Sequence, residues 1–265
     1  MYLIFLGTGG GRWITLNQKM RTGGFRLHAE SNIHVDPGPS ALLAMNEMRI
    51  DPLKTDAVFV THCHPDHYND AEVLIEGMSV GAREKKGTLC ASRSVIVGSD
   101  SLGPAISNYH QEKVLKKYVL DAGQKLKMGG LEIETLPTRH SDPTTVGLKF
   151  YTKEGTITYS SDTEFFDGLY ESYNDSQILI LNTIRPRSDR IPWHLCTEDA
   201  IKITKEIKPK LVILTHFGMK MLKLRSSEAR RVENETGIRT MAANDGIRLN
   251  IRNILKKSQS TLNTF

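Results

Sequence analysis

Short apolar runs rich in β-branched and aromatic residues recur along the chain, with glycine, proline, aspartate or asparagine between them. Runs of this kind are typical of buried or half-buried strands. The pattern predicts strands over residues 2–7, 32–36, 57–62, 94–98, 131–136, 146–151, 156–162, 177–182, 210–216 and 246–251.

Stretches with a helical spacing of apolar residues lie between some of these strands. They predict helices over residues 39–48, 69–78, 197–207 and 219–237. Pro39, Asn69 and Thr197 suit helix starts, and Gly237 suits a helix end. Many strands with few helices do not give a regular strand–helix alternation, so two sheets packed face to face with helices outside fit better.

The composition is that of a globular protein. With 265 residues, 39% apolar and 25% charged, the chain can form a sizeable core. It contains no internal repeat and no low-complexity linker, so a single domain over residues 1–265 is expected. The tail from about residue 256 is expected to be weakly ordered.

Neither a membrane span nor a disulfide framework is expected. No run approaches the ~18 apolar residues that a membrane helix needs, and MYLIFLGTGG at the start lacks the basic region and cleavage site of a signal peptide. The chain has 3 cysteines, far apart, which indicates a reducing compartment. A cytoplasmic location is therefore expected, and a net charge of +5 mildly favours polyanionic partners.

Residues 61–67, THCHPDH, concentrate metal-ligating side chains directly after a predicted strand. If the chain stays extended there, His62 and His64 point the same way and can bind one metal ion. Asp66 and His67 follow where the chain turns, which suits a second ion a few ångströms away. Such a cluster would be costly in a plain loop, so it predicts a metal site.

Three further candidate ligands, His140, Asp162 and His216, also stand at or just past the ends of predicted strands. Each residue taken alone is more often a surface or hydrogen-bonded side chain. Together with the cluster, they predict a site built along one edge of a sheet.

The segment THCHPDH resembles the HxHxDH motif of the metallo-β-lactamase superfamily, and His140, Asp162 and His216 follow in the order of that family's later motifs. The similarity extends from LGTGGG (6–11) to ANDGIRLNI (243–251). This resemblance implies an α+β fold, a four-layer αβ/βα sandwich of two mixed β-sheets flanked by helices. It also implies a dinuclear site in which His62, His64 and His140 hold one metal, Asp66, His67 and His216 hold the other, and Asp162 bridges them.

Two divalent cations in such a site would lower the pKa of a bridging water, giving hydroxide at cellular pH. Asp66 would orient this hydroxide while ligating, and is therefore also a candidate catalytic residue. Zinc fits the nitrogen and oxygen ligands, and manganese or iron could occupy the same site. The bridging aspartate indicates the hydrolase and phosphodiesterase branches of the family.

The segment RIPWHLCTEDAIKI (190–203) resembles ribonuclease Z-like enzymes, in which a histidine precedes a helix. The resemblance implies that His194 contacts phosphate and serves as a general acid for the leaving group. The alternative is that His194 only caps the helix or packs beside Trp193. The chain departs from that pattern at Asn182 and Thr183, where a histidine and a glutamate would stand, so the acidic partner of the general acid is missing.

Two other segments leave alternatives open. The glycines of GTGGGR (7–12) could form a nucleotide-binding loop, but the spacing favours a tight turn near the metal pocket with N–H groups available to an anion. The arginines Arg185, Arg187 and Arg190 could grip phosphate or could simply belong to a solvated loop.

The sequence thus predicts a dinuclear metal-dependent hydrolase, most simply a ribonuclease Z-like phosphodiesterase. One alternative is a hydrolase of a carboxylic ester, thioester or lactone. A second is a non-catalytic, metal-stabilised nucleic-acid-binding protein. The expected partner is a phosphodiester or ester substrate, for which nucleic acid is one open alternative. No membrane partner is expected, and a homodimer is an open alternative to a monomer.

Overall fold

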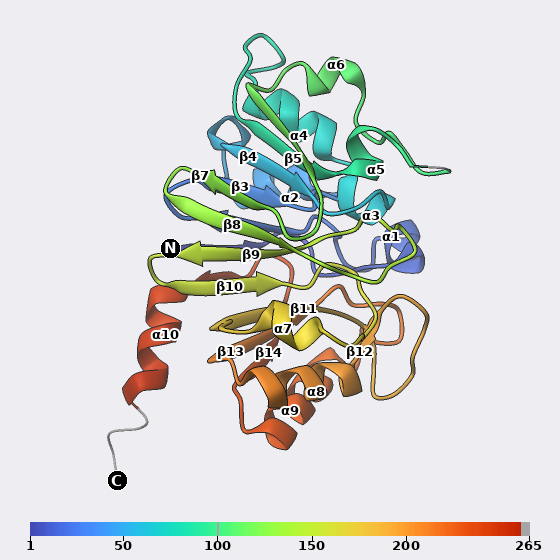
Figure 1. The fold of residues 1–265 in the computed structure, drawn as a ribbon, viewed down its shortest axis with the longest axis vertical. Coiled ribbons are helices and arrows are strands. Elements are labelled where there is room, and N and C mark those ends of the chain that lie inside the picture. Colours follow the sequence, from blue (N-terminus) through green and yellow to red (C-terminus); the bar gives the residue numbers. More distant parts are fainter. Residues whose placement is uncertain (100, 261–265) are drawn as a thin grey trace.

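Two mixed β-sheets pack face to face, and helices cover their outer faces (Figure 1). The computed structural model describes residues 1–99 and 101–260 of the chain. This arrangement confirms the predicted four-layer αβ/βα sandwich.

The first sheet, within the described residues, is 7-stranded in the order β15-β1-β2-β3-β4-β5-β6. Its strands are β1 (Tyr2–Phe5), β2 (Phe25–His28), β3 (Asn32–Val35), β4 (Ala57–Val60), β5 (Thr88–Ser92), β6 (Lys116–Leu120) and β15 (Arg248–Asn250). Pairing is antiparallel among β15, β1, β2 and β3 and parallel from β3 to β6.

The second sheet has the order β14-β13-β11-β10-β9-β8-β7 in the described chain, with β12 paired to β11. Its strands are β7 (Lys125–Met128), β8 (Leu131–Leu136), β9 (Gly147–Thr152), β10 (Gly155–Tyr159), β11 (Ile178–Arg185), β12 (Leu195–Cys196), β13 (Leu211–Thr215) and β14 (Thr240–Ala242). The strands β10, β11 and β13 are parallel. Because β9 is antiparallel to both β8 and β10, β8 runs in the same direction as β10.

The helices form two layers outside the sheets. Against the first sheet pack α2 (Ala41–Glu47), α4 (Ala71–Met78) and α5 (Arg93–Ile96). Against the second sheet pack α7 (Leu169–Tyr173), α8 (Thr197–Ile207) and α9 (Arg225–Thr236). Shorter or peripheral helices are α1 (Arg12–Asn17), η1 (Pro52–Lys54), α3 (Pro65–Tyr68), α6 (Asn108–Gln111) and α10 (Ile251–Ser260).

Strand alternation divides the apolar residues between these layers. In β1, Leu3 and Phe5 face the core between the sheets, whereas Ile4 faces the layer of α2 and α4. Alternate side chains of a strand point to opposite faces, so a strand covered on both sides is apolar throughout. This explains why AVFV (57–60) in β4 is fully buried.

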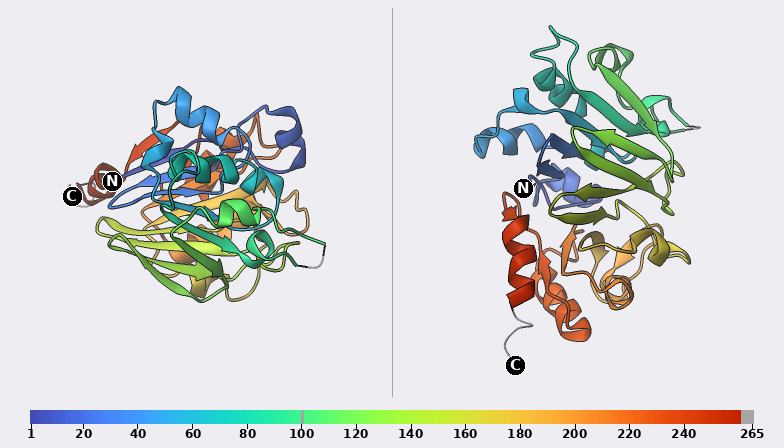
Figure 2. Two further views of the ribbon diagram at one scale, coloured as in Figure 1. Left: turned by 90° about the horizontal axis from the view of Figure 1, so that it is seen from above. Right: turned by 60° about the vertical axis from the view of Figure 1, so that its left-hand side comes forward.

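Helix α10 lies beside the sandwich at the chain's N-terminal edge, apart from both helix layers (Figure 2). Its residues Ile251 and Leu255 join the core between the sheets. The helix extends over part of the segment predicted as a weakly ordered tail, and residues 261–265 of that segment lie outside the described residues. In the described residues, every helix is too short or too polar to span a bilayer.

The predicted strand over residues 94–98 is wrong, because this segment begins as helix α5 (Arg93–Ile96). A short apolar run can be a strand or a buried helix turn, and periodicity alone does not distinguish them. The strand lies just before it, in TLCAS (88–92), whose small side chains give little strand signal. Helix α8 starts one residue earlier than expected, since Cys196 and not Thr197 is its N-cap, and Asp199 completes a capping box.

Candidate metal centre

The predicted ligands meet at one edge of the sandwich. His62, His64, Asp66 and His67 follow β4, whereas His140, Asp162 and His216 follow β8, β10 and β13. Strands that run in one direction place their carboxyl ends along one sheet edge. The ligand atoms form overlapping groups in which all atoms lie within 4.8 Å of one another, and these groups also include His194.

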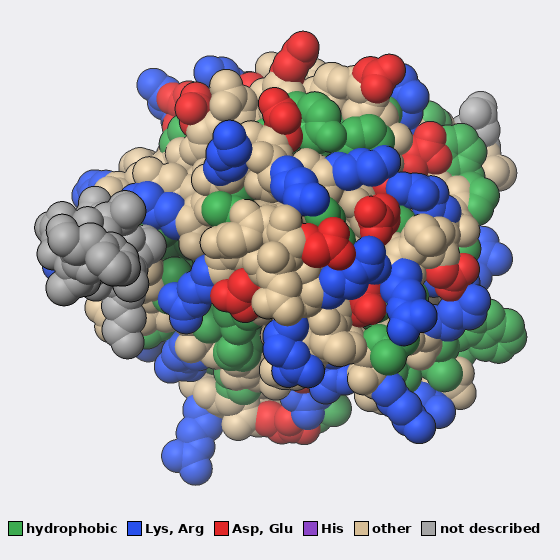
Figure 3. All heavy atoms as spheres, turned by 90° about the horizontal axis from the view of Figure 1, so that it is seen from below, with side chains coloured by type: hydrophobic (Ala, Val, Ile, Leu, Met, Phe, Trp, Pro, Cys, Tyr) green, Lys and Arg blue, Asp and Glu red, His purple; other side chains and the backbone are tan. Residues whose placement is uncertain are grey.

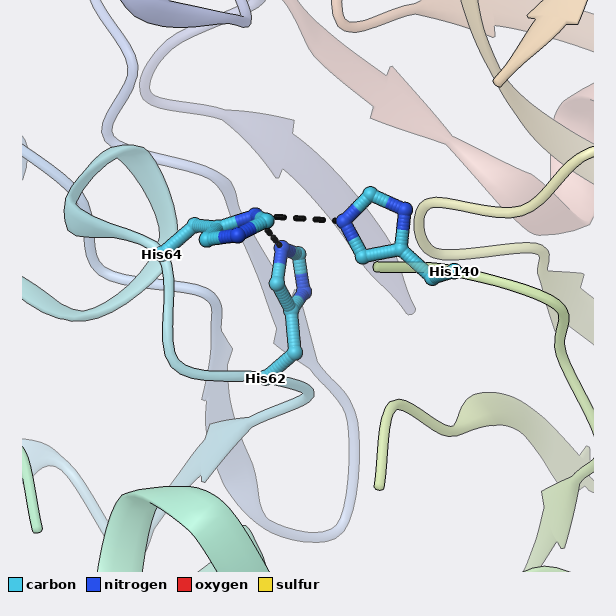
Figure 4. Close-up of side chains that lie close together, drawn as sticks. All are labelled: His62, His64 and His140. Carbon is cyan, nitrogen blue, oxygen red and sulfur yellow. Dashed lines mark hydrogen bonds between the residues drawn. The ribbon is translucent and has the colours of Figure 1, made fainter. Parts of the chain in front are cut away.

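The first group consists of three histidines, His62, His64 and His140 (Figure 4). His64 Nδ1 lies 3.1 Å from His62 Nε2 and 3.1 Å from His140 Nε2. His140 donates its Nδ1–H to the carbonyl of Trp193 at 3.0 Å, so the Nε2 of the neutral ring carries a lone pair. His62 Nδ1 likewise lies 3.2 Å from Thr61 Oγ1, which leaves its Nε2 directed into the group.

The second group contains Asp66, His67 and His216. His216 Nε2 lies 3.1 Å from His67 Nε2 and 3.2 Å from Asp66 Oδ2. His67 donates its Nδ1–H to Asp36 at 2.9 Å, so its Nε2 is directed into the group. Each group therefore gathers three donor atoms around one point.

Asp162 stands between the two groups. Its Oδ2 lies 3.9 Å from His62 Nε2 in the first group, and 3.5 Å and 3.4 Å from the Nε2 atoms of His67 and His216 in the second. Its other oxygen, Oδ1, accepts a hydrogen bond from Asn182 Nδ2 at 2.7 Å. One carboxylate oxygen thus faces both groups while the amide of Asn182 fixes the other.

The donor set suits divalent cations. Burial lowers the pKa of His62 and His64, and lowers that of His140 to about 4, so these rings are neutral at physiological pH. Neutral imidazoles whose second nitrogen is already hydrogen-bonded are the usual ligand form of histidine. Three imidazole nitrogens thus converge on one point, an arrangement that a bound cation would stabilise.

Three nearby carboxylates raise the pKa of His67, in contrast to the lowered pKa values of the three histidines of the first group. Burial, the largest effect, lowers its pKa, but Asp162, Asp36 and Asp66 together outweigh burial and raise the pKa well above its ordinary value. A proton on His67 thus compensates the surrounding negative charge. A bound cation would replace that proton, as metal ligation requires.

Asp36 accepts several hydrogen bonds that fix its carboxylate beside His67. Asp36 accepts from Thr61 N at 2.8 Å, Thr61 Oγ1 at 2.9 Å and Tyr159 OH at 2.8 Å, besides His67. Partners of this kind orient a ligand and raise its basicity. Asp36 is not among the residues predicted for the site, although its position at the end of the predicted strand 32–36 is a signal that could have indicated it.

A second buried carboxylate, Asp142, supports the ligand loop itself. It accepts from the backbone N–H of Cys63 at 2.9 Å, from the hydroxyl of Ser94 and from Thr144. Cys63 lies between His62 and His64, so this contact fixes the backbone from which both imidazoles project. No feature of the sequence pattern singled out Asp142.

The glycine loop at residues 7–12 packs against the second group. A Cβ on Gly10 would lie 2.2 Å from the His216 ring, so only glycine lets that ring approach. The N–H of Gly11 donates to Asp66 Oδ2 at 2.7 Å. The turn thus binds the carboxylate of Asp66, which belongs to the second group. This agrees with the interpretation of GTGGGR as a turn near the metal pocket.

His194 lies at the border of the centre. Its Nε2 is 3.3 Å from Asp162 Oδ2, and its Nδ1 donates to the carbonyl of Pro192 at 2.9 Å. A backbone carbonyl thus orients this ring where the ribonuclease Z pattern would provide an acidic side chain. Burial lowers the pKa of His194, but the contact with Asp162 outweighs it and the pKa is raised.

The arginine loop is largely neutralised within the chain. Arg185 pairs with Asp189 at 3.4 Å, and Arg190 pairs with Asp199 at 2.6 Å. These contacts favour the solvated-loop interpretation of the segment over a phosphate clamp.

Comparisons with known proteins agree with this geometry. A family model described as a beta-lactamase superfamily domain matches residues 31–217. An uncharacterized protein of Methanocaldococcus jannaschii is 41% identical over 254 residues, covering 95% of each chain. Ribonuclease Z of Thermococcus onnurineus is 34% identical over 84 residues, which is 31% of this chain and 26% of that enzyme.

A solved structure supports the fold independently. The metallo-β-lactamase fold protein YhfI of Bacillus subtilis superposes with a TM-score of 0.78 at 19% identity, covering 94% of this chain and 98% of the other. Its fold implies divalent metal ions, and the histidine and aspartate groups described above could bind them. The chain belongs to the metallo-β-lactamase superfamily of metal-dependent hydrolases.

Proposed function

We propose that this protein is a dinuclear metal-dependent phosphodiesterase. The observation that carries the proposal is the position of Asp162, whose Oδ2 lies within 3.3 to 3.9 Å of nitrogens from both ligand groups and from His194. His62, His64 and His140 would hold one ion, Asp66, His67 and His216 the other, and Asp162 would be shared. The nitrogen-rich donor set fits zinc, and manganese or iron would be accepted at the same positions.

The chemistry divides between the ions and the chain. When bound, a pair of divalent cations lowers the pKa of a water molecule and polarises the oxygen of the substrate. Asp66, held by Gly11 N–H at 2.7 Å, keeps a fixed carboxylate oxygen beside that region. His194, with a raised pKa, holds a proton on Nε2 and can deliver it to a departing oxygen.

The preference for phosphodiesters rests on the ribonuclease Z similarity and on His194 beside the shared carboxylate. On the face drawn in Figure 3, basic side chains are scattered among acidic ones and do not gather into one patch. This face therefore offers no single basic patch to a nucleic acid.

Metal analysis combined with a substrate panel tests this function. Purified protein should contain two divalent ions per chain and hydrolyse bis-p-nitrophenyl phosphate in preference to thioesters and lactones. His64→Ala and Asp66→Ala should lose metal and activity together. Turnover of the carboxylic substrates alone would replace the phosphodiesterase proposal. Salt-sensitive binding of RNA or DNA without any turnover would replace the enzyme proposal.

The His194→Ala variant tests the general acid separately. Its metal content should stay at the parent level while turnover of the phosphodiester falls about 100-fold or more. Because the acid must be protonated and its pKa is raised, parent activity should fall as pH rises through that pKa, and the variant should lack this alkaline decline. Substitution of the exposed His28 by alanine is the control and should change neither quantity. Hydrolysis by His194→Ala at the parent rate would exclude the role.

A further inference from the structure

A second concave site lies on the outer face of the first sheet. Its cavity measures about 270 Å³, and its walls include Tyr2, Ile4, Arg26, Arg49, Lys54 and Arg248. Asn32, where β3 begins, also lines it, whereas Asp36 just past the other end of β3 belongs to the metal centre. The cavity is therefore separated from the metal centre by the length of a strand.

The sheet register brings the cavity's cations together. Ile4 pairs with Arg26 on one side and with Arg248 on the other, so all three side chains project from the same face. Arg49, just after α2, and Lys54, in η1, complete the basic wall. Residues far apart in the sequence thus place four positive groups around one small space.

Arg26 is a buried cation without an ion-pair partner. Its side chain is 2% exposed, and it donates to Thr55 Oγ1 at 2.9 Å and to the carbonyl of Lys54 at 3.0 Å, both uncharged oxygens. Burial lowers its pKa to about 10, although Asp56 and Asp51 act against this. A guanidinium carries five N–H donors, so these bonds leave capacity for a further acceptor.

The other cations are also unpaired. Within residues 1–99 and 101–260, no carboxylate forms an ion pair with Arg26, Arg49, Lys54 or Arg248. Asp51 lies in the cavity wall, but its carboxylate accepts the N–H of Leu53 at 3.0 Å as the cap of η1. Arg49, Lys54 and Arg248 are exposed, so the four cations outnumber the one carboxylate of the cavity wall, and this excess of positive charge would attract an anion.

We propose that this cavity binds a small phosphate monoester. Arginine side chains recognise phosphate oxygens in a bidentate manner, and Arg26 with Arg248 supplies two such groups beside Ile4. Ile4 and the ring of Tyr2 provide an apolar wall for a short organic group attached to the phosphate. The site does not depend on the metal centre, so the proposal is independent of the proposed function.

Calorimetric titration of the full-length, zinc-supplemented protein with phenyl phosphate tests the site. Inorganic phosphate and phenol are the comparison ligands. Arg248→Glu and Arg49→Glu, on different elements, should each weaken phenyl phosphate binding at least tenfold. Arg83→Glu makes the same change of charge at an exposed position outside the cavity and should bind as the parent does. His64→Ala, altered only in the metal centre, should also retain this binding.

Several outcomes would overturn the assignment. They are the absence of phenyl phosphate binding to the parent protein, equal weakening by Arg83→Glu and Arg248→Glu, and loss of binding in His64→Ala with retention in both cavity variants. Phenyl phosphate should bind more tightly than inorganic phosphate, and phenol should not bind. Equal affinity for the two phosphates would overturn the role of Tyr2 and Ile4.

Discussion

At the scale of single residues, the centre depends on partners that fix each ligand. Asp36 orients His67, the carbonyl of Trp193 orients His140, and Asn182 holds one oxygen of Asp162. Asn182 is also a departure from the ribonuclease Z pattern. Here its amide bonds to the shared carboxylate and also donates to Tyr159 OH at 3.1 Å. The departure at this position therefore has a structural role in the centre.

Replacing Asn182 tests that role. Asn182→Leu keeps the volume but removes the donor, so Asp162 can rotate and the apparent affinity for zinc should fall about 10–100-fold. Competition with a chromogenic chelator measures this affinity. Thr183→Val, which removes only a hydroxyl bonded to the carbonyl of Leu181 at 3.2 Å, is the matched control on the same strand. An unchanged zinc affinity in Asn182→Leu would show that the amide is dispensable.

At the scale of elements, the predicted metal ligands lie just past the ends of strands, and the strand interiors consist mostly of apolar core residues. One exception is His34, which lies inside β3 and is fully buried. It donates its Nε2–H to the carbonyl of Gly23 at 2.9 Å, and burial lowers its pKa to about 3. The ring is therefore neutral in the folded sheet at every pH at which the protein is expected to work.

This buried histidine should make the fold sensitive to acid. An unfolded histidine has a pKa of about 6.5, so between about pH 6.5 and pH 3 the unfolded chain binds a proton that the folded chain does not. The stabilisation is complete above that window and is lost as pH falls through it, by about 2 kcal/mol between pH 7 and pH 5. Urea unfolding at both pH values should show this loss reduced in His34→Gln.

The matched control for this measurement is His28→Gln, which changes an exposed histidine on the neighbouring strand β2. It should keep the parent pH dependence. His62, His64 and His140 also have lowered pKa values, so they contribute to the pH dependence of the parent's free energy of unfolding. The contribution of His34 is therefore measured by the difference between the parent and His34→Gln. Equal slopes for parent and His34→Gln would contradict the prediction.

At the scale of the whole molecule, the centre joins the two sheets. The predicted ligands after β4 follow a strand of the first sheet, and His140, Asp162 and His216 follow strands of the second. Bound ions would therefore connect the halves of the sandwich across their common edge. The single domain over residues 1–265, the cytoplasmic location and the homodimer stay predictions.

Removing the ions should consequently lower the melting temperature. An ion at about a thousand times its Kd stabilises the native state by about 4 kcal/mol, and about 1 kcal/mol shifts the melting temperature by roughly 2–4 °C in a chain of comparable size. Chelation of both ions should thus lower it by about 20 °C, and added zinc should restore it. Differential scanning calorimetry measures both. A melting temperature unaffected by the chelator would contradict a connecting role for the ions.

The sequence by itself determined the class of fold and predicted the side chains that converge at the candidate metal centre. Apolar runs that end in histidine or aspartate predicted both, because a strand's carboxyl end fixes where the next side chain lies. Helix α5 was missed, since a short buried run fits either a strand or a helix.

Only the tertiary structure decided which residues support the ligands and where a second site forms. Asp36, Asp142 and Asn182 bond to residues distant in the chain, and the basic cavity arises from strand register. Contacts of this kind form only when the two sheets pack. They leave no periodic pattern in either segment, so a sequence pattern cannot predict them.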